Sequence, residues 1–120
     1  MTEDDLLRAV LDMCRLFHLR VAHFRPAQMK DRDGRARWVT AVQADGKGYP
    51  DLTIVGPAGL MFRELKSSTG SVTPEQKTWL LVLSRVADAD TWRPTDLRSG
   101  RIERELRALG SAIVQARETA

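Results

Sequence analysis

Two apolar runs of strand length, separated by a short turn, constrain the fold more than any other part of this sequence. The first run is DLTIVG, residues 51–56, and the second is LMFRELK, residues 60–66. The three residues between them, Pro-Ala-Gly, are typical of the loop of an antiparallel hairpin. In such a hairpin the aspartate that opens the first strand lies beside the Glu-x-Lys that closes the second. We therefore expect Asp51, Glu64 and Lys66 to meet at one end of a sheet.

Helix signals stand on both sides of this hairpin. Residues 3–18 repeat apolar side chains with helical periodicity and Thr2 can cap them, so we expect a first helix there. After the hairpin, Thr73 followed by Pro74 and Gln76 is typical of a helix start with a capping box. The residues expected on the buried faces are Leu6, Val10, Met13 and Phe17 in the first helix and Leu80, Leu83 and Val86 in the second.

The remaining segments predict two more strands and a last helix. Residues 19–25 and 87–93 have the alternation and composition of strands. Residues 26–49 form a long irregular stretch in which 38–44 could be a short extra strand, and loops of this length are usually functional or disordered. An amphipathic pattern predicts a C-terminal helix over about 98–110.

The order of these elements predicts the fold class. A helix between the strands at 60–66 and 87–93 makes that pair parallel, whereas the hairpin is antiparallel. We therefore expect an α/β fold with a small mixed β-sheet flanked by helices. A chain of 120 residues fits a single domain, 1–120, with a core over 3–97 followed by the C-terminal helix.

Composition narrows the class of partner. No apolar run approaches the roughly 20 residues of a membrane span, and the acidic start MTEDDLL lacks the basic region of a signal peptide. A single cysteine fits a reducing cytoplasm, so we expect a cytoplasmic protein without a membrane partner. The net charge of +3 favours a polyanionic partner.

The positive charge is concentrated in one segment. Between Arg20 and Trp38 stand six cationic and two acidic residues, a surplus of four, which is typical of a surface that meets phosphates. His23, on the first predicted strand, could contact a scissile phosphate or could be a sheet histidine. The candidate DNA-binding residues are His23, Arg25, Lys30, Arg32, Arg35 and Arg37.

The two carboxylates of the hairpin suggest a metal. Asp51 and Glu64 would repel each other when both are charged, and a divalent cation removes that conflict. Oxygen ligands suit Mg²⁺ or Mn²⁺, and the carbonyl of Leu65 is a plausible third ligand. Water bound to such an ion attacks phosphodiesters, and Lys66 can position that water and offset developing charge. No organic cofactor is expected.

These residues resemble a nuclease family. Pro50-Asp51 followed by Glu64-x-Lys66 is similar to the motif of the PD-(D/E)xK nucleases, whose core is restriction-endonuclease-like with the order α-β-β-β-α-β. More narrowly, the chain resembles the virus-type replication-repair nuclease modules, or VRR-NUC domains. The matching pieces span roughly residues 3–97 and are Glu3, Gly48-Tyr49-Pro50-Asp51-Leu52, Glu64-Leu65-Lys66 and Thr73-Pro74-Glu75-Gln76.

The resemblance implies a metal-dependent DNA endonuclease. It assigns metal binding to Asp51 and Glu64, catalysis to Lys66 and a supporting role to Gln76, with Glu3 reaching the metal directly or through water. Stand-alone members of this family are typically homodimers that act on branched DNA such as four-way junctions. The segment 26–47 is longer than a minimal member needs, which leaves the substrate geometry open; residues 38–44 are one guess for a dimer surface.

Simpler interpretations stand beside several of these assignments. Gln76 could act only as the capping partner of Thr73. Glu3 could serve only the helix dipole, and Asp4 or Asp5 could take its place. Cys14 and His18, four residues apart, could form half of a zinc site, although core packing explains Cys14 better. Arg93, Arg98, Arg101 and Arg104 are interleaved with acidic residues and indicate an ordinary polar helix face.

Two other functions remain open. The same fold could be a DNA-binding module without chemistry, or a sequence-specific restriction-type endonuclease.

Overall fold

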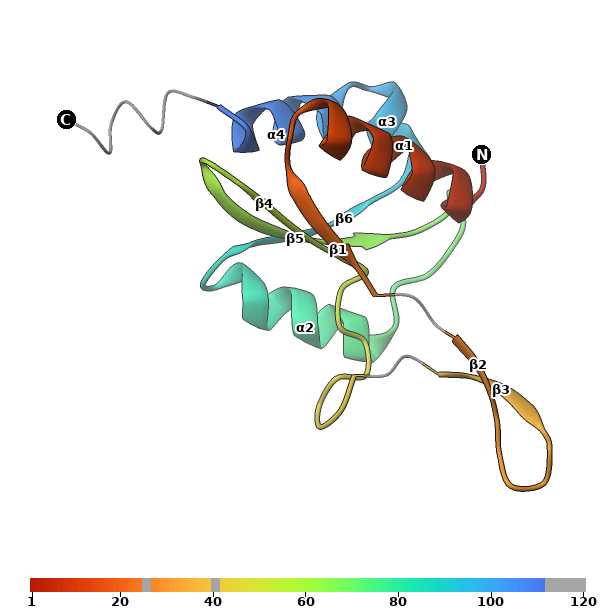
Figure 1. Ribbon diagram of the computed structural model, residues 1–120. Helices are drawn as coiled ribbons and strands as arrows, with labels where there is room; N and C mark the ends of the chain where they lie inside the picture. Colours follow the sequence, from red (N-terminus) through yellow and green to blue (C-terminus); the bar gives the residue numbers. More distant parts are fainter. Residues whose placement is uncertain (25–26, 40–41, 112–120) are drawn as a thin grey trace.

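A four-stranded mixed sheet forms the centre of the fold (Figure 1). Its strands are β1 (Arg20–His23), β4 (Leu52–Gly56), β5 (Gly59–Leu65) and β6 (Asp88–Trp92), in the order β1–β4–β5–β6. β4 pairs antiparallel with both β1 and β5, and β5 pairs parallel with β6. This computed structural model describes residues 1–24, 27–39 and 42–111. The predicted α/β class, with a small mixed sheet flanked by helices, is confirmed.

Helices cover both faces of the sheet. The helices α1 (Glu3–Leu16), α3 (Pro94–Arg98) and α4 (Arg101–Leu109) lie on one face, and α2 (Pro74–Ser84) lies on the other (Figure 1). None of the helices in the described ranges combines the length and apolar composition that a bilayer span requires.

The core lies between the sheet and the three-helix layer of α1, α3 and α4. Burying these apolar side chains supplies the main driving force for folding. The fully buried members of the core include Leu6, Val10, Cys14, Leu52, Ile54, Trp92, Ile102 and Leu106. Since Cys14 is fully buried among them, its interpretation as a packing residue is confirmed.

The first helix follows the prediction closely. Thr2 accepts a hydrogen bond from the backbone N–H of Asp5 at 3.1 Å, and the Asp5 carboxylate accepts from the N–H of Thr2 at 2.8 Å, which completes a capping box. The helix ends at Leu16 rather than residue 18, because His18 adopts a left-handed φ of 57°. Met13 and Phe17 are only partly buried against the core.

The predicted C-terminal helix is confirmed as α4, in which Ile102, Leu106 and Leu109 are buried. It begins at Arg101 rather than at residue 98, because Gly100 takes a φ of +83° and separates it from the short helix α3. One prediction about α2 was wrong. Val86 lies beyond the end of α2 and is 84% exposed rather than buried. The helix α2 contains no fully buried residue, and its predicted inward-facing residues Leu80 and Leu83 are half-buried.

The segment expected to be irregular contains a second, smaller sheet. The strands β2 (Ala27–Lys30) and β3 (Ala36–Val39) pair antiparallel, and the end residues Ala27 and Val39 are partners. At the turn, one oxygen of Asp31 accepts from the N–H groups of Asp33 and Arg35, at 3.0 and 2.9 Å. Gly34 completes the turn with a φ of +77°.

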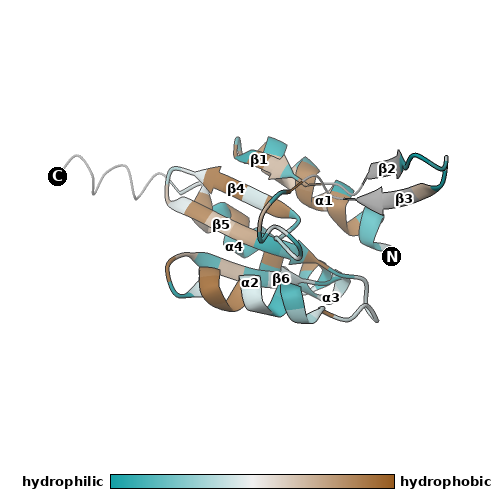
Figure 2. Cartoon of the chain, turned by 90° about the horizontal axis from the view of Figure 1, so that it is seen from below, coloured by the Kyte–Doolittle hydropathy of each residue, from teal (hydrophilic) through white to brown (hydrophobic). Residues whose placement is uncertain are grey.

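We call residues 27–39 the ribbon. It extends away from the four-stranded sheet (Figures 1 and 2). The strand predicted at 38–44 was therefore wrong in position, because β3 begins at Ala36 and ends at Val39. Residues 40–41 of that prediction lie outside the described residues.

The strand β5 carries a buried charge on its core face. Arg63 is 2% exposed and forms ion pairs with Asp88 at 2.9 Å and Glu105 at 2.8 Å. Its guanidinium also lies over the ring of Trp92. Arg63 thus ties β5 to β6 and to α4, and the opposite face of β5 is left for the site.

Candidate active site

The hairpin register brings the two predicted carboxylates together. Leu52 is the partner of Arg63, so one further step along the same register sets Asp51 opposite Glu64. The carboxylate of Asp51 accepts a hydrogen bond from the backbone N–H of Leu65 at 2.8 Å. On its other side, the Asp51 carbonyl accepts from the N–H of Phe24 at 2.8 Å, next to the end of β1. Asp51 is therefore fixed between two neighbouring strands.

Glu64 is the most unusual residue of the site. It is only 2% exposed, and one carboxylate oxygen accepts from the side-chain amide of Gln76 at 3.0 Å. The other oxygen is buried and receives no hydrogen bond from a described donor, and the Asp51 carboxyl lies beside it as an acceptor for a protonated Glu64. Burial, reinforced by the neighbouring Asp51 carboxyl and opposed by Lys66, raises the pKa of Glu64 to about 9. A carboxyl buried against a second carboxyl is costly for stability alone, which points to a functional use.

Gln76 performs two tasks with one side chain. Its amide oxygen accepts from the backbone N–H of Thr73 at 2.9 Å, and its backbone N–H donates to the Thr73 hydroxyl at 3.2 Å, which confirms the predicted capping box. The amide nitrogen of the same side chain donates to Glu64. The start of α2 and the carboxyl of Glu64 are therefore mechanically linked.

Substitutions at Thr73 and Gln76 separate these two tasks. We expect Thr73→Ala and Gln76→Ala each to lower the free energy of unfolding by about 1 kcal/mol, because both break the cap. Only Gln76→Ala removes the donor to Glu64, so only it should also slow any metal-dependent cleavage, by about tenfold or more. Chemical denaturation and a cleavage assay on both variants check this; equal cleavage by the two variants would limit Gln76 to capping.

Lys66 directly follows β5, and its backbone N–H donates to the carbonyl of Trp92 at 3.1 Å. The loop after it is held by Arg93, which donates from one guanidinium nitrogen to the carbonyls of Ser67 and Gly70, both at 2.8 Å. The loop therefore has a fixed path from Lys66 to the start of α2. The prediction that Arg93 belongs to an ordinary polar helix face was wrong, because its side chain serves this loop.

Glu3 lies at the margin of the site. Partial burial and the charge of Asp51 raise its pKa, and Lys66 opposes the shift, so these groups are within electrostatic range of one another. Within residues 1–24, 27–39 and 42–111, however, no three His, Cys, Asp or Glu side chains are grouped closely enough to hold a metal ion. The structure therefore brings the carboxylates of Asp51 and Glu64 together, and the carboxylate of Glu3 lies too far away to form a three-ligand group with them.

The predicted DNA-binding residues lie in several places. His23, in β1, pairs with Leu52 of β4, so its side chain lies on the face of the sheet covered by α1, α3 and α4. Glu64 lies on the other face, towards α2. Lys30, Arg32 and Arg35 are exposed on the ribbon. Arg37 is in β3 but its side chain is outside the described part of the structure, and Arg25 lies outside it entirely.

Sequence reasoning missed an aromatic cluster beside the carboxylates. Tyr49 contacts Phe24, Phe62 and Trp79 edge-on, with ring centroids 5.3, 6.2 and 5.0 Å away. Tyr49 stands two positions before Asp51, and Trp79 stands three positions after Gln76. An aromatic residue close to each motif was the sequence signal from which this cluster could have been predicted.

One glycine allows the loop before Asp51 to reach α2. Gly48 has a φ of +85°, and a Cβ there would lie 2.6 Å from the backbone carbon of Glu75. Only glycine fits this contact. The sequence Gly48-Tyr49-Pro50-Asp51 thus delivers both the aromatic residue and the carboxylate to the start of α2.

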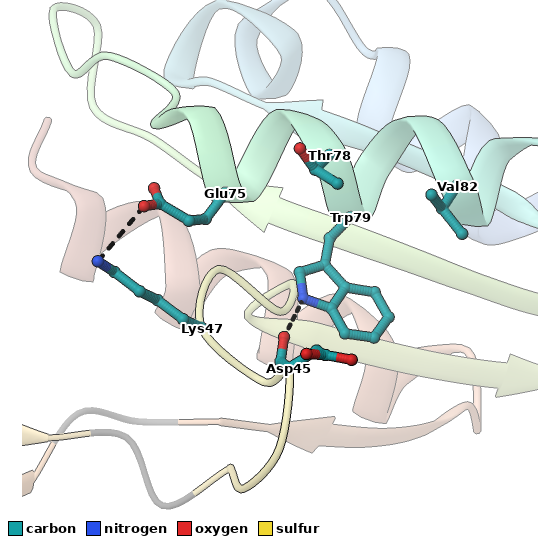
Figure 3. Close-up of a pocket in the computed structure, with 6 residues that line it drawn as sticks. All are labelled: Asp45, Lys47, Glu75, Thr78, Trp79 and Val82. Carbon is teal, nitrogen blue, oxygen red and sulfur yellow. Dashed lines mark hydrogen bonds and ion pairs between the residues drawn. The ribbon is translucent and has the colours of Figure 1, made fainter.

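A shallow depression of about 370 Å³ lies next to this loop, not at the carboxylates (Figure 3). Trp79 donates from its indole nitrogen to the carbonyl of Asp45 at 2.9 Å, and Lys47 pairs with Glu75 at 3.3 Å. Thr78 and Val82 complete the lining. These contacts attach the loop 42–49 to α2, and none of the charged residues of the site lines the depression.

Comparison with known proteins adds no family assignment. Neither the protein-family models, nor the curated proteins, nor the solved structures include a match to this chain.

Proposed function

We propose that this chain is a metal-dependent DNA endonuclease of the VRR-NUC type within the PD-(D/E)xK nucleases. The observation that carries the proposal is the burial of the Glu64 carboxyl directly beside the carboxyl of Asp51. Two carboxyls held together against their repulsion make sense where a cation is bound between them. The lysine two residues after Glu64 and the amide of Gln76 complete a set of groups suited to phosphodiester hydrolysis.

The residues that would hold Mg²⁺ or Mn²⁺ are Asp51, Glu64 and the carbonyl of Leu65. When bound, such an ion supplies an acidified water and charge neutralisation at the phosphate. Gln76 orients the carboxyl of Glu64 through its hydrogen bond, and the Leu65 N–H does the same for Asp51. Lys66 offers a positive charge where the phosphate becomes more negative in the transition state.

Nicking of supercoiled plasmid by the purified protein tests this proposal. Cleavage is expected with Mg²⁺ or Mn²⁺ and not with EDTA, and Lys66→Met should reduce it strongly while binding persists. A panel of linear, flapped and four-way DNA substrates then defines the preferred structure. We expect branched DNA to be cut faster than linear duplex.

Two rival functions give different results in the same assay. A DNA-binding module without chemistry would retard DNA and leave it uncut at every metal concentration. A sequence-specific endonuclease would produce defined fragments from plasmid and would show no preference for junctions. A uniform mixture of nicked products with preference for branches supports the proposal.

We also propose that the enzyme acts as a two-fold dimer, since symmetric nicks across a junction need two sites. The surface that supports this is the outer side of α2 and the segment after it, where Leu81, Val82 and Val86 are 58, 48 and 84% exposed. Exposed apolar residues of this kind are typical of an interface. Sedimentation of the protein should give a dimer, and Val86→Asp should shift it to monomer; an unchanged dimer would place the interface elsewhere.

A further inference from the structure

The ribbon is structurally separate from the four-stranded sheet. Within the described part of the chain, its two strands pair with each other in a sheet of their own and with no other strand. Every side chain of residues 30–36 is exposed. None of its described residues belongs to the hydrophobic core. An isolated two-stranded hairpin is marginally stable in water, so keeping one outside the core suggests that it has a partner.

The charges of the ribbon indicate what that partner is. Lys30, Arg32 and Arg35 are exposed along it. Against them stand Asp31, whose carboxylate accepts from the backbone N–H groups of Asp33 and Arg35, and the exposed Asp33. With Arg37 counted, the ribbon has four cationic and two acidic residues, a net charge of +2. Most of the tip is hydrophilic (Figure 2). A polyanion complements this surface, whereas an apolar protein partner does not.

The dimensions of the ribbon fit duplex DNA. The major groove is about 12 Å wide and admits a two-stranded β-ribbon, and paired strands lie about 4.8 Å apart. The tight turn at Asp31–Arg35 keeps the tip narrow. A narrow cationic ribbon can therefore enter the groove and place its cations against phosphates on both sides.

The base of the ribbon is close to the proposed cleavage site. Phe24 donates its backbone N–H to the carbonyl of Asp51, and Ala27 follows three residues later. Three residues span at most about 10 Å. After the ribbon, the chain returns to this end of the sheet, because the ring of Tyr49 contacts the rings of Phe24 and Trp79.

We infer that the ribbon enters the major groove of a duplex arm next to the phosphodiester that is cut. This inference rests on the proposed function for its position relative to cleavage, but the binding itself does not require chemistry. The ribbon would select DNA that offers a duplex arm beside the scissile bond.

Charge-matched variants test this inference. Lys30, Arg32 and Arg35 are replaced together by Gln, and the control replaces the exposed Arg8, Arg15 and Arg98, all on the three-helix layer, by Gln. Affinity for a short blunt duplex is measured in EDTA at several salt concentrations. We expect the ribbon variant to lower the salt slope by about 2 to 3, near 0.9 for each lost phosphate contact, and the control to leave the slope unchanged. Equal loss in both variants would overturn the inference, as would an absence of duplex binding by the unaltered protein.

A footprint identifies the groove. Dimethyl sulfate reacts with guanine N7, which lies in the major groove. Protection of N7 by the unaltered protein should disappear in a variant whose residues 28–38 are replaced by a Gly-Ser linker, which the pairing of Ala27 with Val39 allows. Thermal denaturation verifies that this variant is folded. Protection that persists without the ribbon would overturn the inference.

The two proposals fail in different ways. Ribbon-dependent duplex binding without cleavage by any metal would refute the endonuclease and leave the ribbon inference standing. Metal-dependent cleavage with the same KM in the ribbon variant and the unaltered protein would refute the ribbon inference alone.

Discussion

Replacing Asp51 with asparagine is expected to reduce metal-dependent DNA cleavage by about 10³-fold or more, because it removes one of two carboxylates proposed to hold the ion. The substitution is conservative for the fold. An asparagine side chain keeps a carbonyl oxygen that can accept the Leu65 N–H, which Asp51 accepts at 2.8 Å. We therefore expect thermal stability close to that of the unaltered protein. Initial rates of plasmid nicking with Mg²⁺ measure the effect.

The matched control for this variant is Asp12→Asn. Asp12 is an exposed residue of α1, and its substitution changes the net charge by the same amount without touching the site. The Asp12→Asn variant should cleave DNA at the rate of the unaltered protein. Full activity in Asp51→Asn would remove the metal centre from the proposal, since no other described carboxylate has been brought against Glu64 in the same way.

Replacing Glu64 with glutamine is expected to have two effects of opposite sign. Cleavage should fall by about 10³-fold or more, because a neutral amide is a poor ligand for Mg²⁺. Stability without metal should rise at neutral and alkaline pH, because the unaltered protein has to take up a proton at Glu64 in order to fold under these conditions and the glutamine variant does not. A residue that lowers stability where it serves function is expected at an active site.

The pKa of Glu64 explains why the substitution should raise the metal-free stability. In the unfolded chain the pKa of Glu64 is near 4.5, and in the folded chain it is about 9. The stability associated with the protonated carboxyl is therefore complete below the unfolded pKa and is lost as the pH rises towards 9. Glu64→Gln has no such loss, so its advantage should grow from pH 5 upwards by about 1.4 kcal/mol for each pH unit and level off near pH 9.

Urea denaturation of both proteins across this pH range, in EDTA, measures the difference. Adding Mg²⁺ should stabilise the unaltered protein and not Glu64→Gln, so that the gap closes. Thr91→Val serves as a control on the neighbouring strand, since it changes a half-buried polar residue without changing a titratable group. A pH-independent difference between Glu64→Gln and the unaltered protein would show that the folded pKa is not raised.

The parts of the fold that were predicted correctly have strong local signals. Thr2 and Thr73 begin helices because their hydroxyls satisfy N–H groups of the first turn. The hairpin of β4 and β5 follows from a turn between two apolar runs, and its register alone brings Asp51 opposite Glu64. The carboxylate pair could therefore be predicted from the sequence, because it depends on one local turn.

The parts that were missed depend on tertiary context. The ribbon strands are short, and the Asp31 turn that joins them was hidden in a basic segment that resembled a loop. Alternation groups His23 with Leu19 and Val21, and in the structure this face packs towards the three-helix layer, away from Glu64. Arg93 acts through carbonyls of a distant loop, which no spacing in the sequence reveals.

The double use of Gln76 sets a thermal limit for this site. When the first turn of α2 frays, the amide leaves Thr73 and the carboxyl of Glu64 together. We therefore expect the proposed activity to be lost on warming before the sheet melts. Its upper working temperature would then follow the stability of a single helical turn rather than that of the whole fold.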